Sequence, residues 1–257
     1  MNKLHKKRAL VTAGAQGIGL AISQHLSRVG CDIFVHYHRS ASDADHLVAE
    51  ARAIGVRAGA AAADLTTASG CEGIVDKAVS FLGGLDILIN NAGSLVARRS
   101  LADATDEFWK DVMELNLGSL RRVTRAAVPH LASAAMTNSG ASIVNLASLA
   151  GRKGGHTGSL AYATSKGAVI TFTRALAGEL APQGIRVNAL APGLILGTSF
   201  HATHTSSDSA QATIAGIPLG RAGTPEDVAR AAVFLASEFD GFITGATLDI
   251  NGGVYVA

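Results

Sequence analysis

Residues 8–29 read RALVTAGAQGIGLAISQHLSRV, which is an apolar run, a glycine-rich turn and a segment of helical period in immediate succession. The run predicts a strand over Arg8–Ala13, and apolar residues at every third or fourth position predict a helix over Ile18–Val29. In such a unit the main-chain N–H groups of the turn can approach a pyrophosphate at the positive end of the helix. A tight turn that binds no ligand would have the same glycines.

Along the rest of the chain, strand-length apolar runs alternate with longer segments of helical period. Further strands are expected at Asp32–Tyr37, Val56–Ala62, Leu85–Asn90, Ala141–Ala147, Ile185–Leu190 and Thr247–Ile250. Helices are expected at Asp43–Ile54, Ala68–Phe81, Asp106–Ala132 and Tyr162–Leu180, and a capped one from Thr224. This alternation predicts an α/β fold with a doubly wound parallel sheet covered by helices on both faces.

The sequence lacks an internal repeat or a linker-like break, so we expect one domain over residues 1–257. Residues 197–217, which we call the flap, are rich in Thr, Ser and His and have little apolar period. We expect this segment to be a mobile cover over a site.

The bulk composition excludes several classes of function. A net charge of +2 without a basic stripe argues against nucleic-acid binding, and no apolar run is long enough to span a membrane. No signal peptide follows the basic residues near the amino end. Cys31 and Cys71 lack metal or redox spacing, which indicates reduced thiols in a cytoplasmic protein. The nine histidines lack metal-binding spacing, so we expect no metal.

Tyr162 and Lys166 are the residues with the clearest chemical meaning. At a spacing of four they share one helix face, which brings an ammonium group beside a phenol. We expect the cation to lower the phenol pKa from about 10, so that Tyr162 can act as an acid or base near neutral pH. The alternative is a half-buried tyrosine beside a solvated lysine.

Polar residues and glycines follow three other expected strands. Asn90–Gly93, Ser148 and Pro192–Gly193 stand at the carboxyl ends of their strands, where open α/β sheets bind ligands. Each could instead be an ordinary turn or loop residue. Their gathering at one edge, with Tyr162 and Lys166 downstream, favours a binding site.

With these motifs in this order the chain resembles the short-chain dehydrogenase/reductase family over nearly its full length. The resemblance implies a seven-stranded Rossmann-like sheet in three layers (α/β/α), a nicotinamide cofactor, and a homodimer or homotetramer. It also implies that Tyr162 donates a proton to a carbonyl oxygen and that Ser148 hydrogen-bonds the same oxygen. Lys166 would hold the nicotinamide ribose and keep the tyrosine acidic, and Asn116 would hold a water that relays protons to Lys166.

The resemblance implies a set of cofactor-binding residues as well. Asp64 resembles the carboxylate that contacts adenine, and Ile195 the residue whose main chain meets the carboxamide. The full set is Gly14, Gln16, Gly17, Ile18, Gly19, His38, Arg39, Ser40, Asp64, Leu65, Asn91, Ala92, Gly93, Tyr162, Lys166, Pro192, Gly193, Ile195 and Thr198.

Three positions depart from the family pattern. Ala13 stands where the first glycine of the turn is usual, and its methyl group could crowd the adenosine phosphates. Ser148 and Tyr162 are one residue further apart than usual, which implies a longer loop between them. The usual threonine after Pro192–Gly193 comes one place late, as Thr198. All catalytic groups are present.

The residues after the second strand bear on cofactor choice. A carboxylate there would bind the ribose hydroxyl of NAD, whereas arginine accommodates the phosphate of NADP. The chain has His38, Arg39 and Ser40 there, and no carboxylate until Asp43. We therefore predict a preference for NADP(H), with NAD possible if Arg39 points into water. The family's other NADP marker, a basic residue in the glycine-rich turn, is replaced by Gln16.

Cations and imidazoles are frequent in the loops expected to surround the substrate. They would suit an anionic keto acid or sugar acid, although they could also be solvated surface. They are Arg98, Arg99, Arg152, Lys153, His156, His201 and His204. The stretches 91–96 and 200–201 also resemble those of bacterial reductases that act on the keto sugar acid made from alginate.

Three functions follow from this sequence. The first is a carbonyl reductase that prefers NADP(H) and acts on a polar small molecule. The second is a 3-oxoacyl carrier-protein reductase, which would need a basic exterior patch for its acidic carrier. The third is a non-catalytic dinucleotide-binding sensor, against which the intact Ser148, Tyr162 and Lys166 argue.

Overall fold

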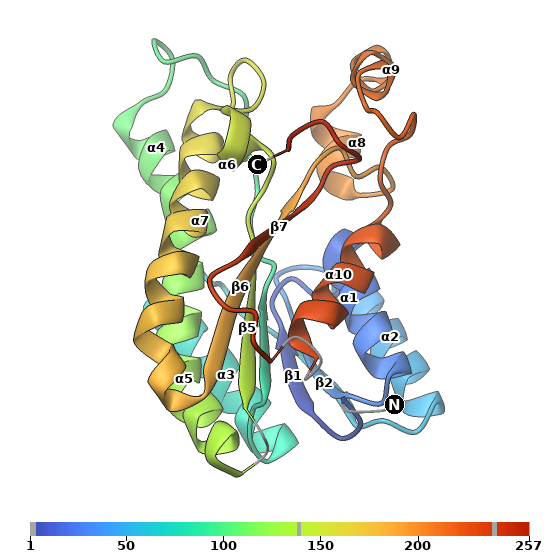
Figure 1. Ribbon diagram of the computed structural model, residues 1–257, viewed down its shortest axis with the longest axis vertical. Coiled ribbons are helices and arrows are strands. Elements are labelled where there is room, and N and C mark those ends of the chain that lie inside the picture. Colours follow the sequence, from blue (N-terminus) through green and yellow to red (C-terminus); the bar gives the residue numbers. More distant parts are fainter. Residues whose placement is uncertain (1–3, 138–139, 238–240, 257) are drawn as a thin grey trace.

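Seven parallel strands form one sheet in the order β3-β2-β1-β4-β5-β6-β7 (Figure 1). The computed structural model describes residues 4–137, 140–237 and 241–256, with only the backbone of residues 200 and 201. The strands are β1 (Arg8–Val11), β2 (Asp32–Tyr37), β3 (Ala58–Ala62), β4 (Ile87–Asn90), β5 (Ala141–Leu146), β6 (Ile185–Pro192) and β7 (Thr247–Ile250). The predicted doubly wound α/β fold is confirmed.

Helices cover both faces of this sheet, as Figure 1 shows. One face carries α1 (Gly17–Arg28), α2 (Ala41–Ala53) and α10 (Pro225–Ala236). The other carries α3 (Ala68–Leu82), α5 (Ser119–Thr137) and α7 (Leu160–Leu180). Shorter elements are α4 (Asp106–Met113), a π-helical turn (Glu114–Gly118), α6 (Ala150–Lys153), a 3-10 turn (Ala181–Gln183), α8 (Ser199–His204) and α9 (Ser207–Ala215).

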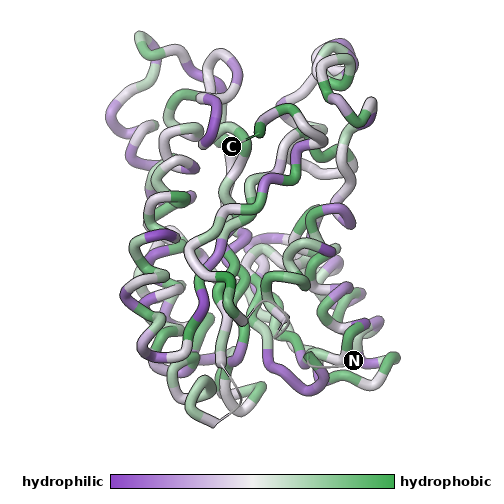
Figure 2. The backbone as a smooth tube through the Cα atoms, viewed as in Figure 1, coloured by the Kyte–Doolittle hydropathy of each residue, from purple (hydrophilic) through white to green (hydrophobic). Residues whose placement is uncertain are grey.

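Both faces of the central strands are buried, which explains why these strands are continuous apolar runs in the sequence. In β1, Leu10 packs toward α3 and α5, while its neighbour Val11 packs toward α1 and α10. Both are fully buried. Figure 2 shows the same contrast along the chain, with hydrophobic strands in the centre and hydrophilic segments on the outer loops.

Two expected elements differ from the structure. The single helix predicted over Asp106–Ala132 is interrupted by the π-helical turn and then continues to Thr137, past Pro129. The flap contains two short helices, α8 and α9, which its weak apolar period did not predict. The side chain of Ser206 accepts a hydrogen bond from the Ser209 N–H and so caps α9.

The order of the strands determines where a site can form. The chain moves outward from β1 to β3 and then returns to add β4 on the other side of β1. The loops that follow β1 and β4 therefore diverge, leaving a crevice at the carboxyl ends of the strands. In the part of the chain that is described, no helix has the length and apolar character needed to cross a membrane.

Candidate active site

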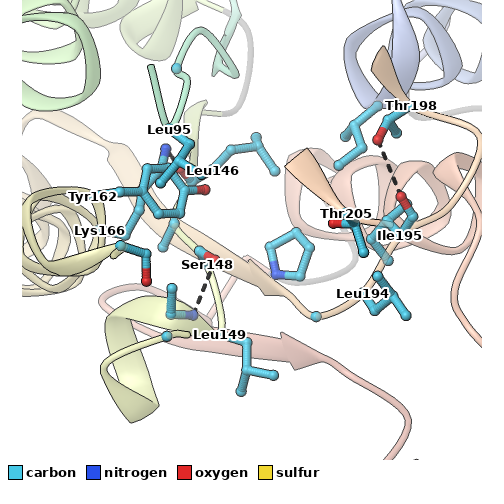
Figure 3. A pocket seen from close by; sticks show the side chains of 18 of the residues that line it. Leu95, Leu146, Ser148, Leu149, Tyr162, Lys166, Leu194, Ile195, Thr198 and Thr205 are labelled. Carbon is cyan, nitrogen blue, oxygen red and sulfur yellow. Dashed lines mark hydrogen bonds between the residues drawn. The ribbon is translucent and has the colours of Figure 1, made fainter. Parts of the chain in front are cut away.

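A cavity of about 500 Å³ lies at the carboxyl edge of the sheet. It extends from the glycine-rich turn, through the ends of β4, β5 and β6, to the flap. Figure 3 draws Ser148, Tyr162 and Lys166 on one side of it and Ile195, Thr198 and Thr205 on the other. The cavity thus brings together residues from distant parts of the sequence.

Ser148 and Tyr162 share a hydrogen bond although the loop between them is longer than usual. The Ser148 Oγ also accepts the Ala150 N–H at 3.1 Å. Between Ser148 and Tyr162 the chain forms α6 and then turns at Gly154 and Gly155, which both have positive φ. The lengthened loop therefore leaves the pair together.

Lys166 projects from α7 into the inner end of the cavity and is 3% exposed. Its Nζ donates to the Leu146 main-chain oxygen at 2.7 Å and lies 5.8 Å from the centre of the Tyr162 ring. A Cβ atom at Gly93 would lie 3.0 Å from this Nζ and 2.6 Å from the Asn116 Oδ1. Only glycine leaves room for the two side chains here.

The expected lowering of the tyrosine pKa is wrong for this structure. Burial raises the pKa of Tyr162 to about 12, and the hydrogen bond to Ser148 opposes that rise. Burial also lowers the pKa of Lys166 to about 8. The cause is the same in both cases: a site with little water disfavours the charged form of each group.

Asn116 lies in the π-helical turn and is fully buried. Its Nδ2 donates to the main-chain oxygens of Ser94 and Val112, both at 2.8 Å, and its Oδ1 accepts the Ser94 N–H. The side chain therefore holds the loop after β4 in place beside Lys166. π-Helical turns are frequent at functional sites.

The glycine-rich turn contains a strained residue. Ala13 has a φ of 48°, a left-handed conformation that favours glycine. Its N–H donates to the His36 Nδ1 at 3.0 Å, and its oxygen accepts from the Asn91 Nδ2 at 3.0 Å. The methyl group is thus accommodated because neighbouring side chains hold the main chain in this conformation.

His36 was not among the predicted site residues, yet it connects two loops of the nucleotide end. Its Nε2 is 3.1 Å from the Ala63 oxygen, and its Nδ1 accepts from Ala13. The ring can satisfy both only as the neutral tautomer with the proton on Nε2. Burial lowers the pKa of His36 and so favours this neutral form.

The remaining predicted residues divide into those that line the cavity and those that support it. Gly14 and Gly19 support it, because a Cβ on either would strike the main chain or side chains beneath the turn. Thr198 reaches the turn despite its late position, since a Cβ on Gly17 would lie 3.4 Å from the Thr198 Cγ2. Those that line the cavity are Gln16, Gly17, Ile18, Asn91, Gly93, Ser148, Tyr162, Lys166, Pro192, Gly193, Ile195 and Thr198.

The expected adenosine end lies at the ends of β2 and β3. His38 and Arg39 are exposed there, and Ser40 precedes the first residue of α2. The Asp64 carboxylate accepts from the Thr66 N–H and hydroxyl, which lowers its pKa, and Leu65 is buried. The Gln16 Nε2 donates to Asp43 at 2.7 Å, so the first carboxylate of α2 does reach the turn.

The predicted group of basic residues is smaller than expected. Arg98, Lys153 and His156 line the cavity. Arg152 instead pairs with Asp249 at 3.0 Å.

Arg99 lies over the Phe108 ring at 5.2 Å. His204 is outside the lining, while the side chain of His201 is beyond what the structure describes. Three of the seven basic residues predicted to surround the substrate, Arg98, Lys153 and His156, therefore line the cavity.

Several lining residues were not predicted. Ser209 and Thr213 of α9 face the cavity, and Thr205 precedes them at the same spacing of four. This hydroxyl period is visible in the sequence and could have indicated them. The apolar residues Leu95, Leu146, Leu194 and Val254 also line the cavity, and only the fold brings them there.

The residues present fit a nicotinamide dinucleotide. Glycines at positions where a Cβ would clash form the turn at one end, and a buried ammonium group lies beside a phenol at the other. The cavity connects the two. Among the described residues, no three His, Cys, Asp or Glu side chains are grouped so as to hold a metal ion.

Comparisons with known proteins agree with this geometry. A family model described as enoyl-(acyl carrier protein) reductase matches residues 12–255. The 3-oxoacyl-[acyl-carrier-protein] reductase of Staphylococcus aureus is 35% identical over 250 residues, which cover 97% of this chain and 98% of that protein.

Two solved structures resemble the whole chain. That of an NADH-dependent reductase, A1-R', responsible for alginate metabolism has a TM-score of 0.92 at 33% identity and covers 100% of both chains. That of a short-chain dehydrogenase from Burkholderia cenocepacia in complex with NADP has a TM-score of 0.89 at 33% identity, over 98% of this chain and 99% of that one.

Proposed function

The chain belongs to the short-chain dehydrogenase/reductase family of NAD(P)-dependent oxidoreductases, and from this premise we propose that it reduces the carbonyl group of a polar small molecule. The observation that carries the proposal is the hydrogen-bonded pair Ser148 and Tyr162 beside the buried Lys166, at one end of a cavity that begins at the glycine-rich turn.

Each residue has a role in this reaction. When bound, the nicotinamide supplies a hydride to the carbonyl carbon. Tyr162 donates its phenolic proton to the carbonyl oxygen, and the Ser148 hydroxyl hydrogen-bonds that oxygen as negative charge develops on it. With its high pKa, Tyr162 is fully protonated near neutral pH and is therefore an acid in this direction.

Lys166 and Asn116 support the proton transfer. The Lys166 ammonium stabilises the phenolate that remains after the proton has left, since it lies beside the ring. Asn116 is proposed to hold a water that returns a proton through Lys166. Because both hydrogens of its side-chain amide are donated to Ser94 and Val112, we propose that a main-chain group of the π-helical turn holds that water.

For the cofactor we propose a preference for NADP(H). The exposed His38 and Arg39, with Ser40 at the start of α2, present positive charge and a hydroxyl to a phosphate. The resembling proteins include an NADH-dependent reductase and a dehydrogenase solved with NADP, so the family resemblance alone does not favour either cofactor. Comparing kcat/KM for NADPH and NADH tests this; a tenfold advantage for NADH would contradict it.

For the substrate we propose an anion, because Arg98, Lys153 and His156 line the cavity and none of its described lining residues is Asp or Glu. A keto acid or keto sugar acid fits, and the resembling reductase of alginate metabolism supports this class. The second candidate is a 3-oxoacyl carrier-protein thioester, supported by the Staphylococcus aureus relative. A non-catalytic sensor remains the distant alternative.

We also propose a homodimer or homotetramer in the cytoplasm. The edge strand β7 exposes Leu248, and the neighbouring α10 exposes Phe234, which leaves apolar surface for a second copy. Cys31 and Cys71 are buried and form no disulfide, which supports a reducing compartment. Size-exclusion chromatography with light scattering measures the assembly.

The reaction is tested by screening keto acids, keto sugars and acyl thioesters with both reduced cofactors. We expect the keto acids to react fastest with NADPH. Ser148→Ala should reduce kcat/KM about 100-fold, because it removes one donor to the developing oxyanion. The exposed Ser100→Ala is the matched control. Failure of every carbonyl to oxidise either cofactor would contradict the proposal.

A further inference from the structure

The flap presents a row of hydroxyl groups to the cavity. Ser209 and Thr213 are four residues apart on α9 and so lie on the same side of it. Thr205, four residues before Ser209, also lines the cavity, and Figure 3 draws it across from Tyr162. The charged and amide side chains of the same helix, Asp208 and Gln211, are not part of the lining.

The hydroxyls of Ser209 and Thr213 are able to bind a ligand. The Thr213 Oγ1 donates to the Ser209 main-chain oxygen at 2.8 Å, which leaves it able to accept. The Ser209 side chain is exposed and has no hydrogen-bond partner among the described residues, so its hydroxyl can both donate and accept. The row therefore offers both kinds of hydrogen bond.

Arg98 fixes this row relative to the catalytic loop. Its guanidinium donates to the His204 main-chain oxygen at 3.3 Å and to the Thr157 main-chain oxygen at 3.2 Å. The first bond reaches the residue immediately before Thr205, and the second reaches the loop that precedes Tyr162. The hydroxyl row and the phenol are thereby tied across the same cavity.

The chemistry of the row discriminates between substrates. An acyl chain against these hydroxyls would remove water without replacing its hydrogen bonds, which disfavours binding for each hydroxyl left unpaired. A substrate with its own hydroxyl groups would satisfy them. The apolar wall of Leu95, Leu194 and Val254 can pack against the carbon skeleton of either.

We propose that Thr205, Ser209 and Thr213 bind the hydroxyl groups of a polyhydroxylated carbonyl substrate, so that the natural substrate is of the sugar-acid type and not an acyl chain. The inference rests on the proposed carbonyl reduction and names the substrate class of that site.

The test uses two keto acids of equal chain length. 2-Ketogluconate carries a hydroxyl on every carbon beyond its carbonyl, whereas 2-ketohexanoate carries none. Both have the same carboxylate, so their contacts with Arg98 cancel in the comparison. Wild-type protein should favour 2-ketogluconate at least about tenfold in kcat/KM, as sites that hydrogen-bond a hydroxyl do.

Two variants test the residues themselves. Ser209→Ala and Thr213→Val should each raise KM for 2-ketogluconate about tenfold with kcat nearly unchanged. For 2-ketohexanoate the same variants should raise kcat/KM, because its chain no longer leaves a hydroxyl unpaired. Ser207→Ala, on the same helix but outside the cavity lining, is the control and should change neither.

Each outcome decides between the alternatives. A wild-type preference for 2-ketohexanoate or for acetoacetyl thioesters overturns the hydroxylated class while leaving carbonyl reduction in place. An equal loss on both keto acids, or none on 2-ketogluconate, overturns the assignment of the residues. Absence of activity on any carbonyl would instead reject the proposed function itself.

Discussion

The loop after β5 and the turn after β1 both depart from the family pattern, and the structure accommodates them in opposite ways. The loop between Ser148 and Tyr162 carries one extra residue, and it forms α6 and an exposed turn with two glycines of positive φ. The turn carries Ala13 in place of glycine and absorbs it as backbone strain, held by His36 and Asn91. Insertions are tolerated where chain is exposed, whereas a methyl group near a tightly packed turn needs specific partners.

The largest expected effect tests whether Tyr162, which follows the lengthened loop, acts as the proton donor. Tyr162→Phe keeps the ring but removes the proton donor, so kcat/KM for carbonyl reduction should fall about 1,000-fold. Cofactor affinity, measured by fluorescence titration, should change little. Tyr255→Phe, which keeps a ring over Arg152, is the control. Retention of more than a tenth of the activity would exclude Tyr162 as the acid.

The second prediction concerns the charge beside that tyrosine. The pKa of Lys166 is lowered to about 8, so its ammonium form is lost as pH rises through that value. If this charge stabilises the phenolate, kcat/KM should be constant below pH 8 and fall about tenfold per pH unit above it. The Lys166→Met variant should have a much lower kcat/KM at every pH, and its pH profile should show no inflection near pH 8. A wild-type rate that rises through pH 8 would assign the lysine another role.

The third prediction moves to the turn after β1. His36→Leu leaves the Ala13 N–H unpaired, and we expect a loss of about 1–3 kcal/mol in the free energy of unfolding. Because burial lowers the pKa of His36 from its ordinary 6.5, its contribution is complete above pH 6.5 and is lost as pH falls toward the lowered value.

Guanidinium unfolding at pH 5 and pH 7 measures both effects. The difference in stability between the wild type and His36→Leu should therefore be smaller at pH 5. The exposed His46→Leu is the control and should match the wild type at both pH values. An equal stability of the His36 variant would mean that Ala13 needs no such support.

The smallest expected effect is that of restoring the usual glycine. Ala13→Gly relieves about 1–2 kcal/mol of left-handed strain, while the greater freedom of the unfolded chain offsets about 0.4–1 kcal/mol. We expect a net gain of about 0.5 kcal/mol by the same unfolding assay. A marked loss would show that the methyl group contributes to packing.

Most of the fold could be predicted because buried parallel strands and amphipathic helices leave strong patterns, as in Arg8–Ala13 and Ile18–Val29. The π-helical turn in the predicted Asp106–Ala132 helix could not, because a single glycine such as Gly118 inside a helical pattern does not reveal a change in the main-chain hydrogen-bond register. The helices of the flap were missed since α9 is held by the Ser206 cap and not by an apolar period.

At the candidate site, the residues of known motifs were easier to predict than their surroundings. The predicted Ser148, Tyr162 and Lys166 do meet at the cavity, and their roles stay predictions. The direction of the tyrosine pKa was wrong because spacing reveals a nearby charge but not how much water is excluded. Only the fold brings His36 beside Ala13.

Gly93 contributes no reacting group, yet it occupies the narrow space between Asn116 and Lys166, where one added carbon atom would collide with the Asn116 Oδ1 and crowd the Lys166 Nζ. In a saturation-mutagenesis library scored for turnover, substitutions of Gly93 by any other amino acid should therefore be depleted. An inactive allele mapped to Gly93 would be a steric lesion and not the loss of a functional group.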